Sequence, residues 1–165
     1  MIKVGEKLPE GVLKEFIETE QPGCAIGPNE FKVQELARGR KIVIFGLPGA
    51  FTPTCSALHV PGYLADYQKL RGKGVDEIWC VSVNDAFVMG AWAREQKSQG
   101  KVRMFGDGDA KFTRALGMDR DIPGMGVRSQ RYSMLVENGV VKSVNLEAPG
   151  KFEVSDAGTM LKQLG

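Results

Sequence analysis

Short, nearly continuous runs of apolar residues recur along the chain and are separated by segments of mixed polarity. Two such runs cover residues 41–45 and 77–83, and a shorter one covers residues 102–105. Strands that are buried on both faces of a sheet have this composition, whereas half-exposed strands alternate between apolar and polar side chains. The pattern therefore predicts two buried strands and a short third one.

Two longer segments carry apolar side chains at helical spacing. Residues 55–70 have them near every third or fourth position, with an interruption at Pro61-Gly62, and predict a kinked helix. Residues 85–96 predict a second helix, with Asn84 or Asp85 as its cap. Strand, helix, strand and helix in succession indicate parallel pairing with right-handed crossovers.

The pattern changes in the last third of the chain. Residues 131–136 and 140–146 alternate around Asn138-Gly139, and Asn-Gly is the strongest short signal for a β-hairpin. A short helix is expected before this hairpin, over residues 110–116. Residues 155–164 are expected to close the chain as a further helix.

Weaker strand signals near the N-terminus complete the predicted fold. Residues 13–17 and 31–33 predict a hairpin with a Gly- and Pro-rich connection, and a short helical turn is expected over residues 35–39. Together the elements predict an α/β protein with a thioredoxin fold, in which helices flank a central mixed sheet that the N-terminal hairpin extends. We expect a single domain over residues 1–165.

The composition narrows the classes of function. The chain has 165 residues, of which 42% are hydrophobic and 25% charged, and a net charge of +2. It offers no basic field for nucleic acid or an acidic membrane surface, and no stretch approaches membrane-spanning length. The beginning of the chain lacks the pattern of a secretion signal, so a cytoplasmic protein is expected.

Three widely spaced cysteines and a single histidine carry the remaining candidate chemistry. Such a set leaves no plausible zinc cluster, and neither a metal nor a cofactor is expected. An odd number of thiols in a chain that needs no disulfide favours a reducing compartment. Cys55 follows the first buried strand by one turn and begins the predicted helix, where backbone N–H groups and the helix dipole favour a thiolate.

The residues PGAFTPTC at 48–55 allow more than one interpretation. A dithiol oxidoreductase or a glutaredoxin-like thiol transferase would have a second cysteine three positions before Cys55, where this chain has Thr52. The Thr52 hydroxyl cannot form a disulfide, but it can donate a hydrogen bond to a thiolate or to a substrate oxygen. Alternatively, the segment is a plain loop and Cys55 packs as a small hydrophobe.

The spacing of Pro48, Thr52 and Cys55 resembles the signature of the peroxiredoxins. Longer blocks are similar to the type II, or peroxiredoxin-5, subfamily and occur in the same order along the chain: FGLPGAFTPTCS at 45–56, HVPGY at 59–63, VSVNDAFV at 81–88 and RYSM at 131–134. The resemblance spans nearly the whole chain. It implies the thioredoxin fold and a thiol-dependent peroxidase that reduces hydrogen peroxide and small alkyl hydroperoxides in antioxidant defence.

The resemblance also implies roles for individual residues. Cys55 would attack the peroxide and become a sulfenic acid, Thr52 would donate a hydrogen bond to it, and Pro48 would cover the pocket. Arg131 would bring its guanidinium beside Cys55 from the start of a different strand, where it favours the thiolate and holds a peroxide oxygen. Arg128, three residues earlier, is the rival candidate.

His59 lies four residues after Cys55, on the same face of the predicted helix. A nucleophile and base pair is therefore conceivable, as in cysteine hydrolases. However, two side chains at this spacing are directed along the helix instead of towards one substrate atom. We expect a supporting role, in which His59 either orients the substrate pocket or simply packs.

Recycling of the oxidised cysteine requires a thiol. Some type II members have a resolving cysteine near the C-terminus, but residues 151–156 contain none. Cys80 matches a second family cysteine and lies in an apolar run that favours inert burial, and Cys24 lies in a Gly/Pro-rich turn without a family counterpart. We therefore expect an external reductant, glutathione with glutaredoxin or thioredoxin, and a homodimer by analogy with the family.

A different class of function would use the same sulfur. A redox sensor or holdase-like binding protein would be oxidised about once at Cys55 and would then change the behaviour of a partner. A peroxidase instead consumes peroxide catalytically when a thiol is supplied. The rate of turnover separates the two.

Overall fold

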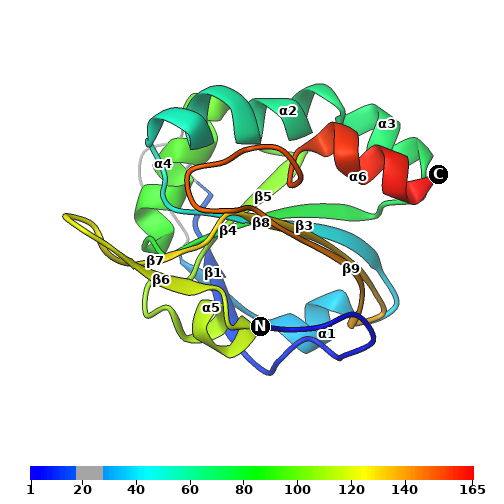
Figure 1. Cartoon of the computed structure of the whole chain (residues 1–165), viewed down its shortest axis with the longest axis horizontal. Helices are drawn as coiled ribbons and strands as arrows, with labels where there is room; N and C mark the ends of the chain where they lie inside the picture. Colours follow the sequence, from blue (N-terminus) through cyan, green and yellow to red (C-terminus); the bar gives the residue numbers. More distant parts are fainter. Residues whose placement is uncertain (18–27) are drawn as a thin grey trace.

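The computed structural model describes residues 1–17 and 28–165. Cys24 lies outside the described residues, as does most of the connection predicted for the N-terminal hairpin. Figure 1 shows a central sheet with helices above and below it. The predicted α/β class with a mixed sheet is confirmed.

A seven-stranded sheet forms the middle layer, in the order β2-β1-β5-β4-β3-β8-β9. Its central strands β3 (Lys41–Leu47), β4 (Glu77–Ser82) and β5 (Val102–Gly106) run parallel to one another. β8 (Tyr132–Glu137) pairs antiparallel with β3 and with β9 (Val140–Leu146), which follows the Asn-Gly turn. The sheet is therefore parallel in the middle and antiparallel towards this edge.

The N-terminal hairpin forms the other edge of the sheet. β1 (Val12–Glu15) pairs antiparallel with β2 (Asn29–Lys32), and it also bridges to β5. The helix α1 (Val33–Ala37) begins directly after β2. Val33, which was predicted to lie in the strand, is the first residue of this helix. Its side chain and that of Ala37, one turn later, form the buried side of the helix.

Alternation along β3 divides the core into two layers. Val43, Phe45 and Leu47 point to one face of the sheet, which is covered by α4 (Ala86–Gln96), α6 (Ala157–Leu164) and the helical segment that begins at Cys55. The neighbouring residues Ile42 and Ile44 point to the other face, with α1 and α5 (Lys111–Leu116). This period of two is why a wholly apolar run forms a doubly covered strand.

The helical segment after Cys55 differs in detail from the predicted kinked helix. It begins with a π-helical turn η1 (Cys55–His59), continues as α2 (Val60–Ala65) and, after a break at Asp66, as α3 (Tyr67–Gly72). Pro61, where the sequence predicted an interruption, lies in the first turn of α2. Because proline has no N–H, the α-type hydrogen bond to Ala57 cannot form, and the N–H of Val60 bonds to the carbonyl of Cys55 instead.

A second small sheet was not predicted. β6 (Asp119–Ile122) and β7 (Gly126–Ser129) form an antiparallel hairpin that projects from the body of the molecule, at the left of Figure 1. Most of its side chains are exposed or only partly buried. Two residues, Gln130 and Arg131, connect the hairpin to β8. Both β7 and β8 contact β3.

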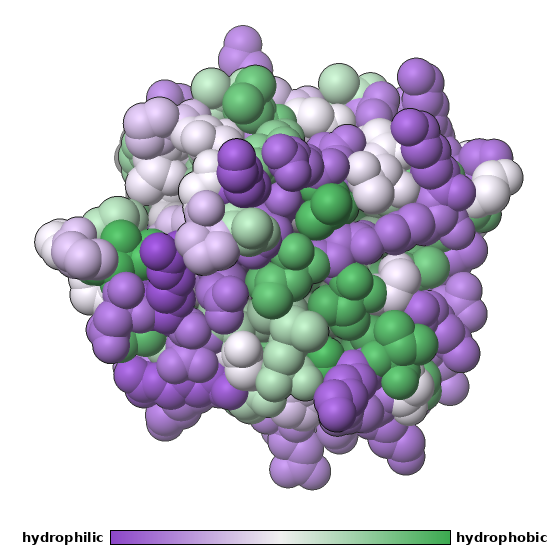
Figure 2. All heavy atoms as spheres, viewed as in Figure 1, coloured by the Kyte–Doolittle hydropathy of each residue, from purple (hydrophilic) through white to green (hydrophobic). Residues whose placement is uncertain are grey.

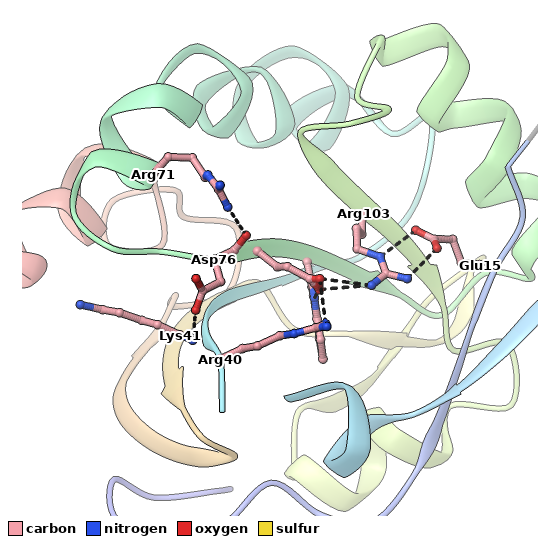
Figure 3. A network of polar contacts seen from close by, with 8 residues as sticks. Glu15, Arg40, Lys41, Arg71, Asp76 and Arg103 are labelled. Carbon is pink, nitrogen blue, oxygen red and sulfur yellow. Dashed lines mark hydrogen bonds and ion pairs between the residues drawn. The ribbon is translucent and has the colours of Figure 1, made fainter. Parts of the chain in front are cut away.

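Ion pairs connect the strands at the N-terminal edge (Figure 3). The guanidinium of Arg103 on β5 donates to the carboxylate of Glu15 on β1, at 2.8 Å, and to that of Glu77 on β4, at 3.1 Å. Its carbon lies 4.7 Å from the ring centroids of Phe31 and Phe105. The network links β1, β4 and β5 and so supports the sheet.

The face of the molecule shown in Figure 2 has polar side chains around its rim and a group of apolar ones near its centre. Elsewhere, Phe51 and Leu58 remain about half exposed close to Cys55 in the chain, at 50% and 56%. Within residues 1–17 and 28–165, no helix has the length and apolar character needed to cross a bilayer.

Candidate active site

The close approach of β8 to β3 sets the geometry of the site. Gly46 on β3 is paired with Tyr132 on β8, and a Cβ atom at Gly46 would lie 2.2 Å from the Tyr132 ring. Only glycine allows the tyrosine to lie across the strand at this point. Arg131 precedes Tyr132, so this contact holds the arginine beside the loop that leads from β3 to Cys55.

Cys55 and Arg131 meet at the start of η1. Nη2 of Arg131 donates to Sγ of Cys55 across 3.2 Å. The cysteine is fully buried, at 0% exposure, among side chains of the core layer beneath α2. A guanidinium at this distance stabilises a negative sulfur that water does not reach, and it keeps its own charge.

His59 contacts the other end of the same guanidinium. Nη1 of Arg131 lies 2.9 Å from Nδ1 of His59, and Nε2 of the histidine lies 3.2 Å from the carbonyl oxygen of Ser155. Arginine can only donate, so Nδ1 accepts and Nε2 carries the proton. Burial and the charge of Arg131 lower the pKa of His59 from 6.5 to about 3. The histidine is therefore neutral and faces Arg131, which argues against a cysteine and histidine catalytic pair.

The segment between β9 and α6 supports the histidine. The carbonyl of Ser155 accepts hydrogen bonds from both His59 and the hydroxyl of Tyr63, the latter at 2.8 Å. Phe152 in the same segment lies edge-on to His59, with ring centroids 5.0 Å apart, and 5.8 Å from the guanidinium carbon of Arg131. Residues from two distant parts of the chain thus hold the arginine from both sides.

Glu147 organises this segment from inside. Its carboxylate accepts hydrogen bonds from the N–H groups of Glu153, Val154 and Ser155 and from the Ser155 hydroxyl, at 2.7 to 2.9 Å. Burial by itself raises the pKa of Glu147, but these hydrogen bonds outweigh it and leave the pKa below its ordinary value. Sequence reasoning missed Glu147, because its hydrogen-bond partners are mainly backbone groups, which every residue type has.

Thr52 differs from its predicted geometry. Its hydroxyl donates to the carbonyl of Gly49 at 2.7 Å, so the proton that was expected to point at the substrate is already used. Within the described residues, no hydrogen bond joins Thr52 to Cys55 directly. What the hydroxyl offers a ligand is a lone pair on its oxygen, which accepts a hydrogen bond.

Arg128, the rival to Arg131, contacts the loop and not the sulfur. Its Nη1 donates to the carbonyl of Pro48 at 3.3 Å, and its Nε donates to the carbonyl of Met125 at the same distance. A Cβ at Gly49 would lie 2.7 Å from this guanidinium. Arg128 therefore fixes the backbone of the loop that carries Pro48, and Arg131 is the arginine at Cys55.

Asn84 supports the loop before Cys55, whereas the sequence analysis considered it, with Asp85, as a cap of the following helix. The helix α4 is capped by Asp85, whose carboxylate accepts from the N–H of Val88 at 2.8 Å. The side-chain oxygen of Asn84 instead accepts from the N–H of Ala50, at 2.9 Å, and from the Ser82 hydroxyl. Phe51, which follows Ala50 in the loop, has a φ of 64°, a left-handed conformation that is unusual for a bulky side chain.

Cys80 lies in the same core layer as Cys55 but in different surroundings. It is on β4 with 0% exposure, and burial raises its pKa well above the ordinary value. A thiol in such a position remains protonated and inert. No group of three or more histidine, cysteine or acidic side chains within residues 1–17 and 28–165 is arranged to hold a metal ion.

One sulfur faces a fixed guanidinium, at the junction of strand and helix where a dithiol protein of this fold would have a second cysteine. The molecule is a thiol-dependent peroxidase on a thioredoxin fold. The sequence profile of the family named Redoxin matches residues 3–161. The chain belongs to the peroxiredoxins of type II, as the sequence resemblance implied.

Known relatives agree over the full length. The chain is 43% identical to Peroxiredoxin-2B of Arabidopsis thaliana, over 99% of this chain and 98% of the relative. A solved structure of reduced Prx3 from Vibrio vulnificus, in complex with hydrogen peroxide, is 48% identical, covers 100% of both chains and has a TM-score of 0.92.

A structure from Burkholderia cenocepacia is also similar, with 58% identity over 100% of this chain and 99% of its own, and a TM-score of 0.95. It carries the provisional name of a thioredoxin reductase. This chain has Thr52 where a dithiol site would require a cysteine, so that name does not describe the chemistry found here.

Proposed function

We propose that Cys55 is the peroxide-reducing residue of this peroxidase and that its substrates are hydrogen peroxide and small alkyl hydroperoxides. The observation that carries the proposal is the 3.2 Å hydrogen bond from Arg131 to Sγ of Cys55. It supplies charge stabilisation to a sulfur that is otherwise surrounded by apolar side chains. Complete burial of this sulfur favours small peroxides over bulky ones.

The chemical step forms one bond and breaks another. The thiolate of Cys55 attacks the terminal oxygen of the hydroperoxide, an S–O bond forms and the O–O bond breaks. The sulfur is oxidised to a sulfenic acid, and the peroxide is reduced to an alkoxide or hydroxide, which takes a proton to become an alcohol or water. The barrier depends on how well the site stabilises charge that moves from sulfur to the departing oxygen.

The neighbouring residues divide this task. The Arg131 guanidinium favours the thiolate and offers N–H groups to a peroxide oxygen, since it has five donors and the described contacts use only part of them. Thr52 accepts the hydrogen bond of the peroxide O–H through its oxygen, which orients the peroxide for attack. Pro48, held by Arg128, covers the site and excludes water.

His59 acts as a positioning residue in this proposal. Its Nδ1 accepts from Arg131 and so holds the guanidinium in the plane that faces the sulfur. Because the imidazole is neutral and has both nitrogens engaged, it neither removes a proton from Cys55 nor binds substrate directly. His59 therefore both packs in the core and orients the pocket through Arg131.

Recycling is proposed to use an external thiol. The sulfenic acid of Cys55 condenses with one thiol to give a mixed disulfide and water, and a second thiol then releases Cys55 and a disulfide. Cys80 is a poor resolving residue because it is buried and protonated. Glutathione with glutaredoxin is the reductant we favour, with thioredoxin as the alternative donor.

We further propose that the protein works as a homodimer in the cytoplasm. Phe51 is half exposed close to Cys55 in the chain, and covering it by a second copy would remove apolar surface from water. Sedimentation equilibrium of the wild type and of Phe51→Glu measures this, since the charge should favour the monomer. A wild type that stays monomeric at all concentrations would contradict the dimer.

The experiment that tests the function measures peroxide consumption with a panel of reductants. Wild type, Cys55→Ser and Cys80→Ser are each supplied with glutathione and glutaredoxin, with thioredoxin, or with dithiothreitol. We expect Cys55→Ser to lose turnover with every reductant and to keep its fold, whereas Cys80→Ser retains turnover. Turnover that persists in Cys55→Ser would reject Cys55 as the attacking group.

A further inference from the structure

A pocket of about 220 Å³ is lined by Thr54, the residue before Cys55, and by Arg131, which contacts Sγ of Cys55. Three segments form its walls: the Pro48 loop with the start of η1, the β6–β7 hairpin with the residues that lead into β8, and the segment between β9 and α6. Residues of the last two segments lie close together there, although they are far apart in the sequence. Pro48, Thr54 and Arg131 line the pocket, so a molecule that approaches Cys55 from this side meets it first.

The charged side chains of the walls are mostly cations. Arg120, Arg131 and Lys151 line the pocket, and Glu147 is the one acidic residue. The Glu147 side chain is buried behind the wall, and its carboxylate is already bound by several N–H groups of its own segment. Its charge is therefore largely compensated, and the field that an incoming ligand meets is positive.

The β6–β7 hairpin places two arginines directly opposite each other. Arg120 on β6 is in register with Arg128 on β7, so both side chains lie on the same face. Like charges in this relationship repel, and a protein gains no stability from them. The acidic neighbours Asp119 and Asp121 alternate to the opposite face of the strand.

Within residues 1–17 and 28–165, neither arginine of this pair forms an ion pair with an acidic side chain, and the same holds for Lys151. Lys151 projects from the segment on the other side of the pocket. The remaining lining includes apolar side chains, among them Leu58 and Phe152. Uncompensated cations around a partly apolar hollow suit an organic anion with a short aliphatic body.

We propose that this pocket binds the carboxylate of a small anionic co-substrate, held by Arg120 and Lys151, while its reacting group is directed towards Cys55. The inference rests on the proposed peroxidase function and names the class of molecule that the site accepts. A carboxylate-bearing thiol, such as glutathione, is the ligand that the positive walls of the pocket and the recycling step favour. A carboxylate-bearing hydroperoxide has the same recognition chemistry, and the experiment separates the two sources.

Binding is measured first, without any turnover. S-Methylglutathione, which has carboxylates but no free thiol, is titrated into the Cys55→Ser protein and followed by NMR chemical shifts, in parallel with its diethyl ester. We expect the acid to bind more tightly than the ester and to shift the resonances of residues 120 and 147–152. Arg120→Gln and Lys151→Gln should each weaken binding of the acid by about two- to fivefold, as expected for solvent-exposed charges.

Kinetics then separate the two sources of the anion. With tert-butyl hydroperoxide as oxidant, glutathione is compared with its diethyl ester; with dithiothreitol as reductant, a short carboxylate-bearing hydroperoxide is compared with tert-butyl hydroperoxide. We expect Arg120→Gln and Lys151→Gln each to lower kcat/KM for glutathione by about two- to fivefold. Both variants should leave kcat/KM for the uncharged co-substrates unchanged. The preference for the acid should shrink as salt is raised from about 0.02 M to about 0.5 M.

Exposed cations elsewhere on the molecule serve as matched controls. Arg114→Gln on α5 and Lys142→Gln on β9 remove the same charges away from the pocket and should leave acid and ester kinetics as in the wild type. Equal binding of acid and ester by the Cys55→Ser protein would overturn the inference, as would equal losses in the control variants. A change confined to the peroxide comparison would reject the thiol as the ligand and assign the anion to the peroxide.

The two proposals can fail separately. If no thiol supports peroxide turnover but Arg120→Gln and Lys151→Gln still weaken S-methylglutathione binding, the peroxidase assignment of Cys55 fails and the anion site stands. If turnover is normal and neither variant changes binding or the acid-to-ester ratio, the anion site fails and the peroxidase stands.

Discussion

His59 accepts a hydrogen bond from Arg131 through Nδ1, at 2.9 Å, and burial together with this contact keeps the histidine neutral. A proton on Nδ1 would face the guanidinium and would break the hydrogen bond that orients it. The histidine is therefore part of the support for Arg131, and its neutrality is a condition for the geometry at Cys55.

The neutral state of His59 leads to a first prediction. It is the only histidine in the chain, so its imidazole gives a single set of NMR signals. We expect these signals to report a neutral ring with the proton on Nε2 at pH 5, well below the ordinary pKa of histidine. A ring that titrates near pH 6.5 would contradict the hydrogen bond to Arg131.

The same shift predicts how stability depends on pH. Between pH 6.5 and about 3 the unfolded chain binds a proton at His59 and the folded chain does not, so the free energy of unfolding falls as the pH is lowered. The contribution approaches about 1.4 kcal/mol per pH unit below the unfolded pKa. Chemical denaturation of wild type and His59→Gln from pH 7 to 5, above the range of ordinary carboxyl groups, measures it. The variant should lack this slope.

The two arginines near the site should respond differently to substitution. Arg131→Met removes the hydrogen bond to Cys55, so peroxide reduction should slow by about tenfold or more. Arg128→Met is the matched variant, because it removes a guanidinium that contacts only the loop at Pro48 and Met125. A rate of peroxide reduction that falls in Arg128→Met and not in Arg131→Met would reverse the assignment.

Local sequence signals predicted the part of the fold that is buried on both faces. The apolar runs that became β3 and β4, and the Asn-Gly turn between β8 and β9, are visible without any knowledge of neighbours. The β6–β7 hairpin has no such signal, because its exposed strands carry charges and no apolar alternation. The π-helical turn was also missed. Pro61 has no N–H to donate, and the turn is closed by the hydrogen bond from the N–H of Val60 to the carbonyl of Cys55.

The residues of the site also fall into a group that the sequence predicted and a group that it did not. Pro48, Thr52 and Cys55 are close in the sequence, and a family resemblance identified them together with Arg131. The supports were not predictable, because they act through backbone atoms far away in the chain. The Ser155 carbonyl that receives the hydrogen bond of His59 is 96 residues away, and any residue type has a carbonyl.

Thr52 is expected to act through the oxygen of its hydroxyl. Thr52→Val keeps the volume but removes both the acceptor and the hydrogen bond to Gly49, and peroxide reduction should slow by about tenfold or more. Thr52→Ser retains the hydroxyl and should recover most of the rate. Stopped-flow measurement of cysteine oxidation isolates this step from recycling. If valine is as fast as threonine, the hydroxyl has only a packing role.

Cys80 is expected to be dispensable for recycling. Its burial keeps the thiol protonated, and a protonated thiol is a poor nucleophile towards a sulfenic acid. Cys80→Ala should therefore turn over peroxide at close to the wild-type rate with glutathione and glutaredoxin. Cys24→Ser should do so as well. Loss of recycling in either variant, with single-turnover oxidation of Cys55 unchanged, would identify that cysteine as a resolving residue.

Glu147 is expected to position the site from a distance. Glu147→Gln places an amide donor among N–H groups that need an acceptor, and we expect the free energy of unfolding to fall by about 2 kcal/mol. Because the folded pKa of Glu147 is lowered, its stabilisation is complete above the ordinary glutamate pKa and is lost as the pH falls through the lowered value. The acid sensitivity of stability below about pH 4.3 should therefore be smaller in the variant than in the wild type.

A purely structural role for Glu147 would lower stability and leave the chemistry of Cys55 alone. A positioning role also changes the His59 NMR signals and slows the oxidation of Cys55 by peroxide, because the Ser155 carbonyl no longer holds the histidine against Arg131. Glu153→Gln, which changes an exposed carboxylate in the same segment, is the control and should leave all of these measurements unchanged. His59 signals and a Cys55 oxidation rate identical to the wild type in folded Glu147→Gln would remove Glu147 from the support of Cys55.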